Sequence, residues 1–265
     1  MIRFGPAGIG SVKDAIFNLN KYNQLGLKAC EIPFTYGIYI KKEEDAKKIK
    51  EAAKKLGIKL SIHAPYWINL NSADDEKINK SRQRILECCR VGSILGAERV
   101  IFHPGYYGKR SKEETYKNIK KEIQTLQKEI EKRGYNIKLA PETMGKVNVF
   151  GSVEEILNLV EDTGCDFCID FAHILARDKD YKFQEVLNKL KKFNNKEIHL
   201  HFSGIIYGES GEKYHKKTPE KDLKDLIENL LFFSKEKDYI IINESPEPVE
   251  DSVVGIKIYK SISSL

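Results

Sequence analysis

The chain has 265 residues, of which 41% are hydrophobic and 32% charged, and its formal net charge is +6. This length is enough for one large domain with a sizeable core, whereas no apolar run approaches the roughly 20 residues of a membrane span. Because the five cysteines also argue against a disulfide framework, we expect a soluble, cytoplasmic protein.

Short apolar runs alternate with longer stretches of helical spacing along the chain. Each apolar run is rich in β-branched residues and is bounded by Gly, Pro, Asn or Ser, as strands are. The predicted strands are residues 2–5, 29–34, 59–64, 99–103, 137–142, 166–171, 197–202 and 239–244. The predicted helices are residues 43–56, 75–95, 112–133, 152–160 and 219–233.

This alternation predicts a single (β/α)8 barrel over residues 1–265. A doubly wound open sheet is the alternative, but it usually has a glycine-rich phosphate loop after its first strand. Here the first turn is Gly5-Pro6-Ala7-Gly8-Ile9-Gly10, which fits that pattern poorly. In a barrel, catalytic residues come from the C-terminal ends of several strands and meet on one face, so we expect the site there.

Ligand-type side chains are concentrated at the ends of the predicted strands. All six histidines lie at or just after an apolar run, and two other runs end in Glu142 and Glu244. One such histidine is more often structural than functional, but six together weaken that interpretation. Buried carboxylates are rare unless they are paired or bind a cation. Strands one and two supply no candidate. The candidates from strands three to eight are His63, His103, Glu142, Asp170, His173, His199, His201, His215 and Glu244.

The types of ligand indicate the metal. Imidazole and carboxylate without thiolate favour Zn²⁺, with Mn²⁺ or iron as alternatives. The candidates are too many for one ion, so at least two are expected, with a carboxylate available as a bridge. Cys165 and Cys168 have the spacing of a metal pair, but no second pair accompanies them, and we interpret them as core residues.

Several motifs resemble those of the endonuclease IV family of abasic-site (AP) endonucleases, which belongs to the xylose isomerase-like barrel superfamily. They occur in the family's order and span nearly the whole chain. The motifs are His63-Ala64-Pro65-Tyr66-Trp67-Ile68-Asn69-Leu70, Phe102-His103-Pro104-Gly105, Pro141-Glu142-Thr143, Cys168-Ile169-Asp170-Phe171-Ala172-His173, His199-Leu200 and Asn243-Glu244-Ser245-Pro246. The resemblance implies a monomeric, zinc-dependent enzyme that cuts double-stranded DNA 5′ to an abasic site.

The resemblance also implies a trinuclear site. The implied ligands are His63, His103 and Glu142 for the first ion, Glu142, Asp170, His199 and Glu244 for the second, and His173 with His215 for the third. The family has an Asp two residues before the last histidine, where this chain has Lys213. Glu212 or His201 could replace that Asp, or the third ion could be absent. Glu142 would orient the attacking hydroxide, and Lys213, if it points inward, would bind the phosphate.

Binding of duplex DNA requires a wedge and a basic rim. Tyr66 or Trp67 would fill the gap left by the missing base. Lysines and an arginine that follow predicted strand ends would contact phosphates, in keeping with the net positive charge. The candidate substrate contacts are Tyr66, Asn69, His201, Lys109, Arg110 and Lys216.

Two other functions fit parts of the pattern. Sugar isomerases and epimerases on the same barrel bind one divalent ion, and Glu142, Asp170, His199 and Glu244 would suffice for it. Such an enzyme has no need of His103, His173 and His215 as ligands. The third hypothesis is a protein that binds abasic DNA but has lost turnover through the change at Lys213.

Overall fold

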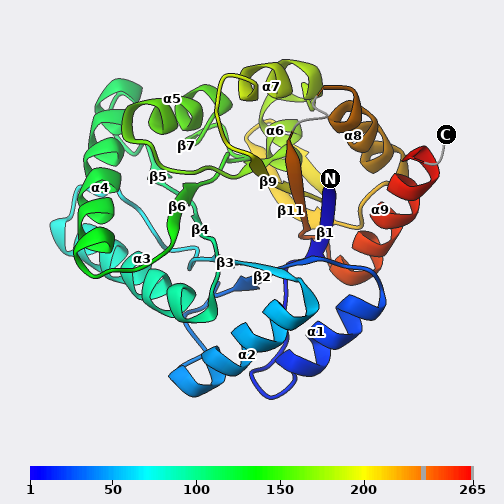
Figure 1. The fold of residues 1–265 in the computed structure, drawn as a ribbon. Coiled ribbons are helices and arrows are strands. Elements are labelled where there is room, and N and C mark those ends of the chain that lie inside the picture. Colours follow the sequence, from blue (N-terminus) through cyan, green and yellow to red (C-terminus); the bar gives the residue numbers. More distant parts are fainter. Residues whose placement is uncertain (234–236, 264–265) are drawn as a thin grey trace.

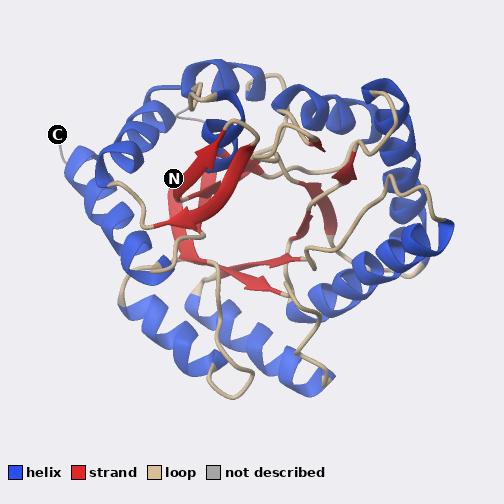
Figure 2. Cartoon of the chain, turned by 180° about the vertical axis from the view of Figure 1, so that it is seen from behind, coloured by secondary structure: helices blue, strands red, loops and turns tan. Residues whose placement is uncertain are grey.

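The computed structural model describes residues 1–233 and 237–263. Over these residues, eight parallel strands enclose a centre and the helices form an outer ring (Figures 1 and 2). The strands are β1 (Ile2–Pro6), β2 (Ala29–Pro33), β3 (Lys59–His63), β4 (Arg99–Phe102), β6 (Lys138–Pro141), β8 (Ile169–Asp170), β9 (Glu197–Phe202) and β12 (Asp238–Asn243). All eight coincide with predicted strands, and the predicted (β/α)8 barrel is confirmed.

The barrel consists of two four-stranded halves that are joined along two seams. One half has the order β1-β12-β9-β8 and the other β2-β3-β4-β6. Single parallel bridges close the seams, Ala7 to Glu31 on one side and Glu142 to Cys168 on the other. At the first seam a Cβ on Gly5 would lie 1.9 Å from the Ala29 carbonyl oxygen, so only glycine allows this approach. Closure brings all eight C-terminal strand ends to one mouth.

The helices pack an apolar face against the outside of the strands. Their bounds are α1 (Ala15–Gln24), α2 (Glu43–Leu56), α3 (Asp75–Leu95), α4 (Lys112–Lys132), α5 (Val153–Thr163), α6 (Phe171–Asp178), α7 (Phe183–Leu190), α8 (Glu220–Phe233) and α9 (Pro248–Ser263). In α2, for example, Ala46, Ile49 and Ala53 are buried at a helical spacing, while its charged residues face outward. Burying a side chain of this kind, such as Ile49, stabilises the fold by about 1.5–3 kcal/mol.

Local signals set several helix ends. The Ser152 hydroxyl accepts from the Glu155 amide and the Glu155 carboxylate accepts from the Ser152 amide, which is a capping box. Gly57 and Gly96 end α2 and α3 in the left-handed conformation that glycine tolerates. The five predicted helices are all present, with bounds within three residues of the prediction. No helix in the described ranges is both long enough and apolar enough to span a membrane.

Two small antiparallel pairs add to the mouth, and neither is predicted from the sequence. β5 (Gly105–Tyr106) pairs with β7 (Val149–Phe150), and β10 (Gly204–Gly208) pairs with β11 (Gly211–Lys216). The second pair contains a bulge, because Ile206 lies opposite Tyr214 whereas the next residue, Tyr207, lies opposite Glu212. Lys213 is therefore the extra residue, left outside the pairing.

Candidate metal centre

The strand ends bring five ligand-type side chains to the centre of the mouth. His63 ends β3, Asp170 ends β8, and His201 lies near the end of β9. Glu142 and Glu244 directly follow β6 and β12. All are almost fully buried except Glu244, whose side chain is 17% exposed. So many ionisable groups are kept from water only where they offset one another or bind a cation.

Glu142 lies at the middle of this cluster. Its Oε2 atom is 3.2 Å from Nε2 of both His63 and His103, and its Oε1 atom is 3.0 Å from His201 Nδ1. Burial by itself would raise the pKa of Glu142, but the neighbouring histidines, His201 foremost, lower it well below its usual range. The charged carboxylate thus directs its two oxygens to different sets of histidines, as a bridging ligand requires.

Of the four groups of possible ligands in the described part of the chain, one is Cys168 with His199 and His201, and the other three are adjacent at the mouth. Within each group the donor atoms lie within 4.8 Å of one another. The three groups at the mouth are His63, His103 and Glu142; Glu142, Asp170, His201 and Glu244; and His173, Glu212 and His215.

Asp170 supplies the clearest sign that a cation fits. Its Oδ1 atom accepts a hydrogen bond of 2.8 Å from the His173 amide and caps α6, but its buried Oδ2 atom has no hydrogen-bond donor. Burial raises the pKa of this carboxyl group. His173 Nδ1 lies 3.4 Å from this oxygen without a hydrogen bond, while Glu142 and Glu244 add negative charge nearby, so a divalent cation would offset the cost of burying it. The oxygen and imidazole donors fit Zn²⁺ or Mn²⁺.

Backbone contacts orient two of the histidines. His63 Nδ1 lies 2.8 Å from the Ala64 carbonyl oxygen, and His173 Nδ1 lies 2.9 Å from that of Thr143. A carbonyl oxygen can only accept, so each Nδ1 carries a proton, and a metal ion that displaces the second proton of the ring would bind through Nε2. Those Nε2 atoms face Glu142 and Glu212 respectively, as ligand atoms would.

The structure places His201, and not the predicted His199, beside Asp170 and Glu244. The register of β8 and β9 sets Asp170 beside His201. His199 points to the same side of β9 but lies two residues, about 6.6 Å, further from the mouth. His201, predicted as a substrate contact, is therefore buried as a ligand-type residue.

The second strand, from which no candidate was predicted, supplies a buried carboxylate beneath the ligand groups. Glu31, in the middle of β2, is fully buried in the barrel. Its Oε1 atom lies 3.0 Å from His201 Nε2, and its Oε2 atom lies 3.1 Å from His199 Nε2. Burial raises the pKa of Glu31, but the two histidines outweigh it and the net shift is well below the usual range. The signal was a single charged residue within the apolar run Ala29-Cys30-Glu31-Ile32.

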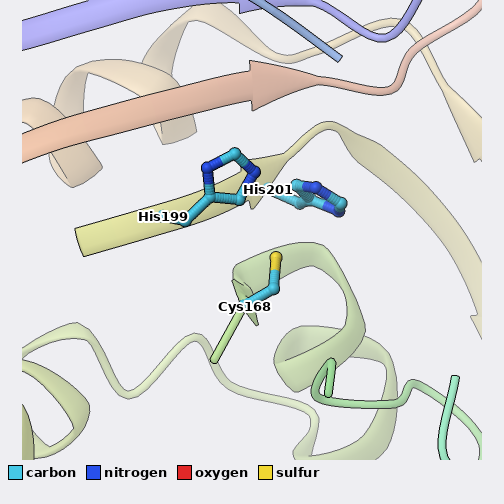
Figure 3. Close-up of side chains that lie close together, drawn as sticks. All are labelled: Cys168, His199 and His201. Carbon is cyan, nitrogen blue, oxygen red and sulfur yellow. The ribbon is translucent and has the colours of Figure 1, made fainter. Parts of the chain in front are cut away.

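Cys168 directly precedes β8, the strand that pairs with β9, and lies beside the two histidines of β9. Figure 3 shows its sulfur directed from the chain before β8 toward the rings of His199 and His201, and all three side chains are buried. Burial raises the pKa of the Cys168 thiol well above its ordinary value, so the sulfur stays protonated. Cys165 is buried too, which confirms the interpretation of this pair as core residues.

Glu212, and not Lys213, accompanies the two outer histidines. His173 Nε2 lies 3.4 Å from Glu212 Oε2, and the rings of His173 and His215 are 5.4 Å apart. Lys213 is exposed and lies outside the cluster. The bulge explains this. In a regular strand the side chain of Lys213, two residues before His215, would share its face, but the extra residue in β11 puts Glu212 there instead.

A cavity of about 330 Å³ opens above the ligand groups. Besides ligands from all three groups, its lining includes Tyr66, Tyr106, Met144 and Lys146. A larger hollow of about 1080 Å³ lies at the opposite end of the barrel, where Lys59, Arg99 and Glu197 begin their strands. The smaller cavity is the candidate site, because the ligand-type side chains converge there.

The predicted substrate contacts have different surroundings. Tyr66 is 47% exposed and stacks on His103, with 5.4 Å between ring centroids. Lys109 and Lys216 are exposed on loops and strands of the mouth.

Two other predicted contacts are engaged within the protein. Arg110 Nη1 donates to the backbone carbonyls of Asn71 and Ser72. The side-chain oxygen of Asn69 accepts from the amides of Asn71 and Tyr106. Both residues order the loops behind the mouth.

Comparison with known sequences places the chain among barrel proteins. A family model described as xylose isomerase-like TIM barrel matches residues 19–258. A Methanocaldococcus jannaschii protein described as uncharacterized is 38% identical over 274 residues, covering 99% of this chain and 98% of that protein. A probable endonuclease 4 of Mycobacterium marinum is 29% identical over 137 residues, which are 51% of this chain and about half, 52%, of that relative.

Solved structures of similar fold have several activities. SacUVDE superimposes with a TM-score of 0.75 at 16% identity, covering 100% of this chain and 99% of the other. Endonuclease IV from Thermus thermophilus has a TM-score of 0.70 at 20% identity, covering 99% and 100%. D-psicose 3-epimerase from Clostridium cellulolyticum has a TM-score of 0.68 at 12% identity, covering 99% and 97%. At these identities the likeness concerns the fold alone.

Proposed function

We propose, from the premise that this chain belongs to the xylose isomerase-like TIM barrel family, that it is a metal-dependent endonuclease of the endonuclease IV type. It would hydrolyse the phosphodiester bond 5′ to an abasic site in double-stranded DNA, as a cytoplasmic monomer. The observation that carries this proposal is the surplus of ligands beyond a one-ion set: His63 and His103 on one side, and His173, Glu212 and His215 on the other. The relatives named as endonuclease 4 support it.

The residues of the three groups divide the work. Zn²⁺, or Mn²⁺, would lower the pKa of a bound water and neutralise phosphate charge. His63, His103 and Glu142 would hold one ion, Glu142 with Asp170, His201 and Glu244 a second, and His173 with Glu212 and His215 a third. Glu142 would also orient the attacking hydroxide. Lys213, exposed on the hairpin, becomes a phosphate contact in this proposal.

The rim of the mouth suits a nucleic acid. Tyr66 and Trp67 are 47% and 49% exposed, and either can fill the space of a missing base. Lys109, Lys146 and Lys216 are exposed, and Lys146 lines the same cavity as Tyr66, so these lysines would supply positive charge for the phosphates. An abasic nucleotide has no base to unstack, so turning it into the cavity costs little and favours this substrate.

A second candidate function is a sugar epimerase. Glu142, Asp170, His201 and Glu244 form a one-ion group by themselves, and D-psicose 3-epimerase shares the fold. That function leaves His173, Glu212 and His215 without a task. It predicts one tightly bound ion per chain and no nuclease activity.

The test is cleavage of a duplex with one stable abasic analogue, with and without EDTA. We expect a nick 5′ to the lesion that EDTA or Glu142→Gln abolishes. Glu122→Gln is the matched control, because Glu122 is a buried carboxylate whose partner Arg82 lies outside the barrel. No nick from protein with at least two bound ions would contradict the proposal, and epimerisation of a ketose would favour the second candidate.

A further inference from the structure

Four side chains form a continuous polar chain inside the barrel, beneath the candidate metal centre. In order they are Arg99, His199, Glu31 and His201, and none is more than 4% exposed. Arg99 Nη1 lies 3.0 Å from His199 Nδ1, His199 Nε2 lies 3.1 Å from Glu31 Oε2, and Glu31 Oε1 lies 3.0 Å from His201 Nε2. These four side chains thus connect the start of β4, by way of β9 and β2, to the ligand group.

Arg99 determines the protonation of His199. A guanidinium group has donors only, so the His199 Nδ1 atom beside it must accept and carries no proton. The proton of the neutral ring is therefore on Nε2, which donates to Glu31 Oε2. Burial, reinforced by Arg99, lowers the pKa of His199 to about 4 against the opposing effect of Glu31, consistent with a neutral ring.

Glu31 in turn acts on His201. Its Oε2 atom is occupied by two donors, His199 Nε2 and the Ser61 hydroxyl at 2.7 Å. Its Oε1 atom faces His201 Nε2 at 3.0 Å but not at a hydrogen-bonding angle, and neither atom has another partner. A carboxylate there favours a proton on Nε2. Nδ1 shares its own proton with Glu142 Oε1, and a metal ion that displaces this proton would bind the lone pair of Nδ1. That atom faces Glu142 Oε1 at 3.0 Å and Glu244 Oε2 at 3.4 Å.

The neighbour on the other side offers no competing charge. Cys168, just before the neighbouring strand β8, points at the two rings (Figure 3), but its buried thiol stays protonated. Glu31 therefore supplies the negative charge on this side of His201. A carboxylate behind a ligating imidazole fixes the ring and makes it a better ligand.

We propose that Glu31 is a positioning residue that keeps the Nδ1 lone pair of His201 directed at the metal centre, and that Arg99, through His199, keeps Glu31 in place. The inference rests on the metal site of the proposed function and not on the DNA substrate. It assigns tasks to residues of β2 and β4 that contribute nothing to the cavity above.

The first experiment measures Zn²⁺ affinity by competition with a chromophoric chelator. Glu31→Gln replaces one carboxylate oxygen by an NH₂ group, which must oppose the donor of either His199 or His201. We expect a loss of affinity of about 10- to 100-fold. Glu122→Gln, which removes a buried carboxylate outside the barrel, should bind Zn²⁺ as tightly as the wild type. Ser61→Ala, which removes one donor to Glu31, should have an intermediate effect and serves if Glu31→Gln does not fold.

The second measurement is ¹⁵N NMR of the imidazole nitrogens, which a merely structural role of Glu31 would not affect. In the zinc-loaded wild type we expect His199 with its proton on Nε2 and His201 bound through Nδ1. In Glu31→Gln the Nε2 signal of His201 should change. Unchanged affinity in Glu31→Gln, or His201 bound through Nε2, would overturn the proposal. Neither readout uses DNA, so the outcome stands apart from that of the nuclease assay.

Discussion

Single residues decide which histidines face the candidate site. His199 and His201 each stand between two apolar residues in the sequence, and both side chains point into the barrel from β9. Only the pairing of Asp170 with His201 distinguishes them, and strand register is a tertiary property that a local motif does not contain. By contrast, His63, His103 and Glu142 come together as predicted, because each lies at or directly after the end of its own strand.

The third ligand group gives the prediction at the residue scale. Glu212→Ala should lower the number of bound zinc ions by one per chain, since His173 and His215 alone make a weak site. Lys213→Ala should leave that number unchanged, because Lys213 is exposed and outside the group. Metal content of the dialysed proteins, measured by mass spectrometry, checks both. The roles would be reversed if Lys213→Ala lost the ion and Glu212→Ala kept it.

At the scale of elements, strong local signals predicted well and weak ones did not. α2 and α3 have regular apolar spacing and a terminal glycine, and their predicted bounds are correct. α6 was missed because the sequence around Asp170 and His173 continues an apolar strand, and the helix begins only where the Asp170 side chain caps it. The hairpin of β10 and β11 is not predicted, because it packs on the mouth and the local pattern of apolar and polar residues does not indicate strands there.

The bulge in this hairpin supports a second prediction. Glu212 and His215 are three residues apart, and Lys213, which is left outside the pairing, is the extra residue between them. Deleting Lys213 should therefore give a regular ladder in which Glu212 stands two residues before the histidine and still faces it. We expect the deletion variant to bind as many zinc ions as the wild type. The metal content of the dialysed protein, measured by mass spectrometry, checks this.

A control separates register from charge. Lys213→Asp places a carboxylate two residues before His215 without removing the bulge, so combined with Glu212→Ala it should not restore the third ion. Restoration by this double variant, or loss of the ion in the deletion variant, would contradict the role given to the bulge.

At the scale of the whole molecule, the barrel has a polar axis between two different ends. At the N-terminal end Arg99 is held by Asp166 at 3.2 Å and Glu197 at 3.4 Å. At the C-terminal end the ligand groups surround Glu142, and Glu31 lies between. The alternation of apolar runs and helical stretches in the sequence predicts the barrel but not this axis. Strands are identified by their apolar residues, and the axis consists of charged and polar residues inside strands.

The axis makes stability depend on pH through His199. Its pKa is lowered from 6.5 to about 4, mainly by burial. Between these values the unfolded chain binds a proton at this position and the folded chain does not. The stabilising contribution is therefore complete above about pH 6.5 and is lost as the pH falls to about 4, a change of about 3 kcal/mol.

His199→Asn isolates this effect, because asparagine offers Arg99 an acceptor but does not titrate. Urea unfolding of metal-free wild type and variant should give free energies whose difference shrinks as the pH falls from about 6.5 to about 4. Titrating groups that do not interact with His199 affect both proteins alike and cancel in the difference. Parallel curves for the two proteins would mean that His199 is protonated in the fold, and that Arg99 does not hold it neutral beside Glu31.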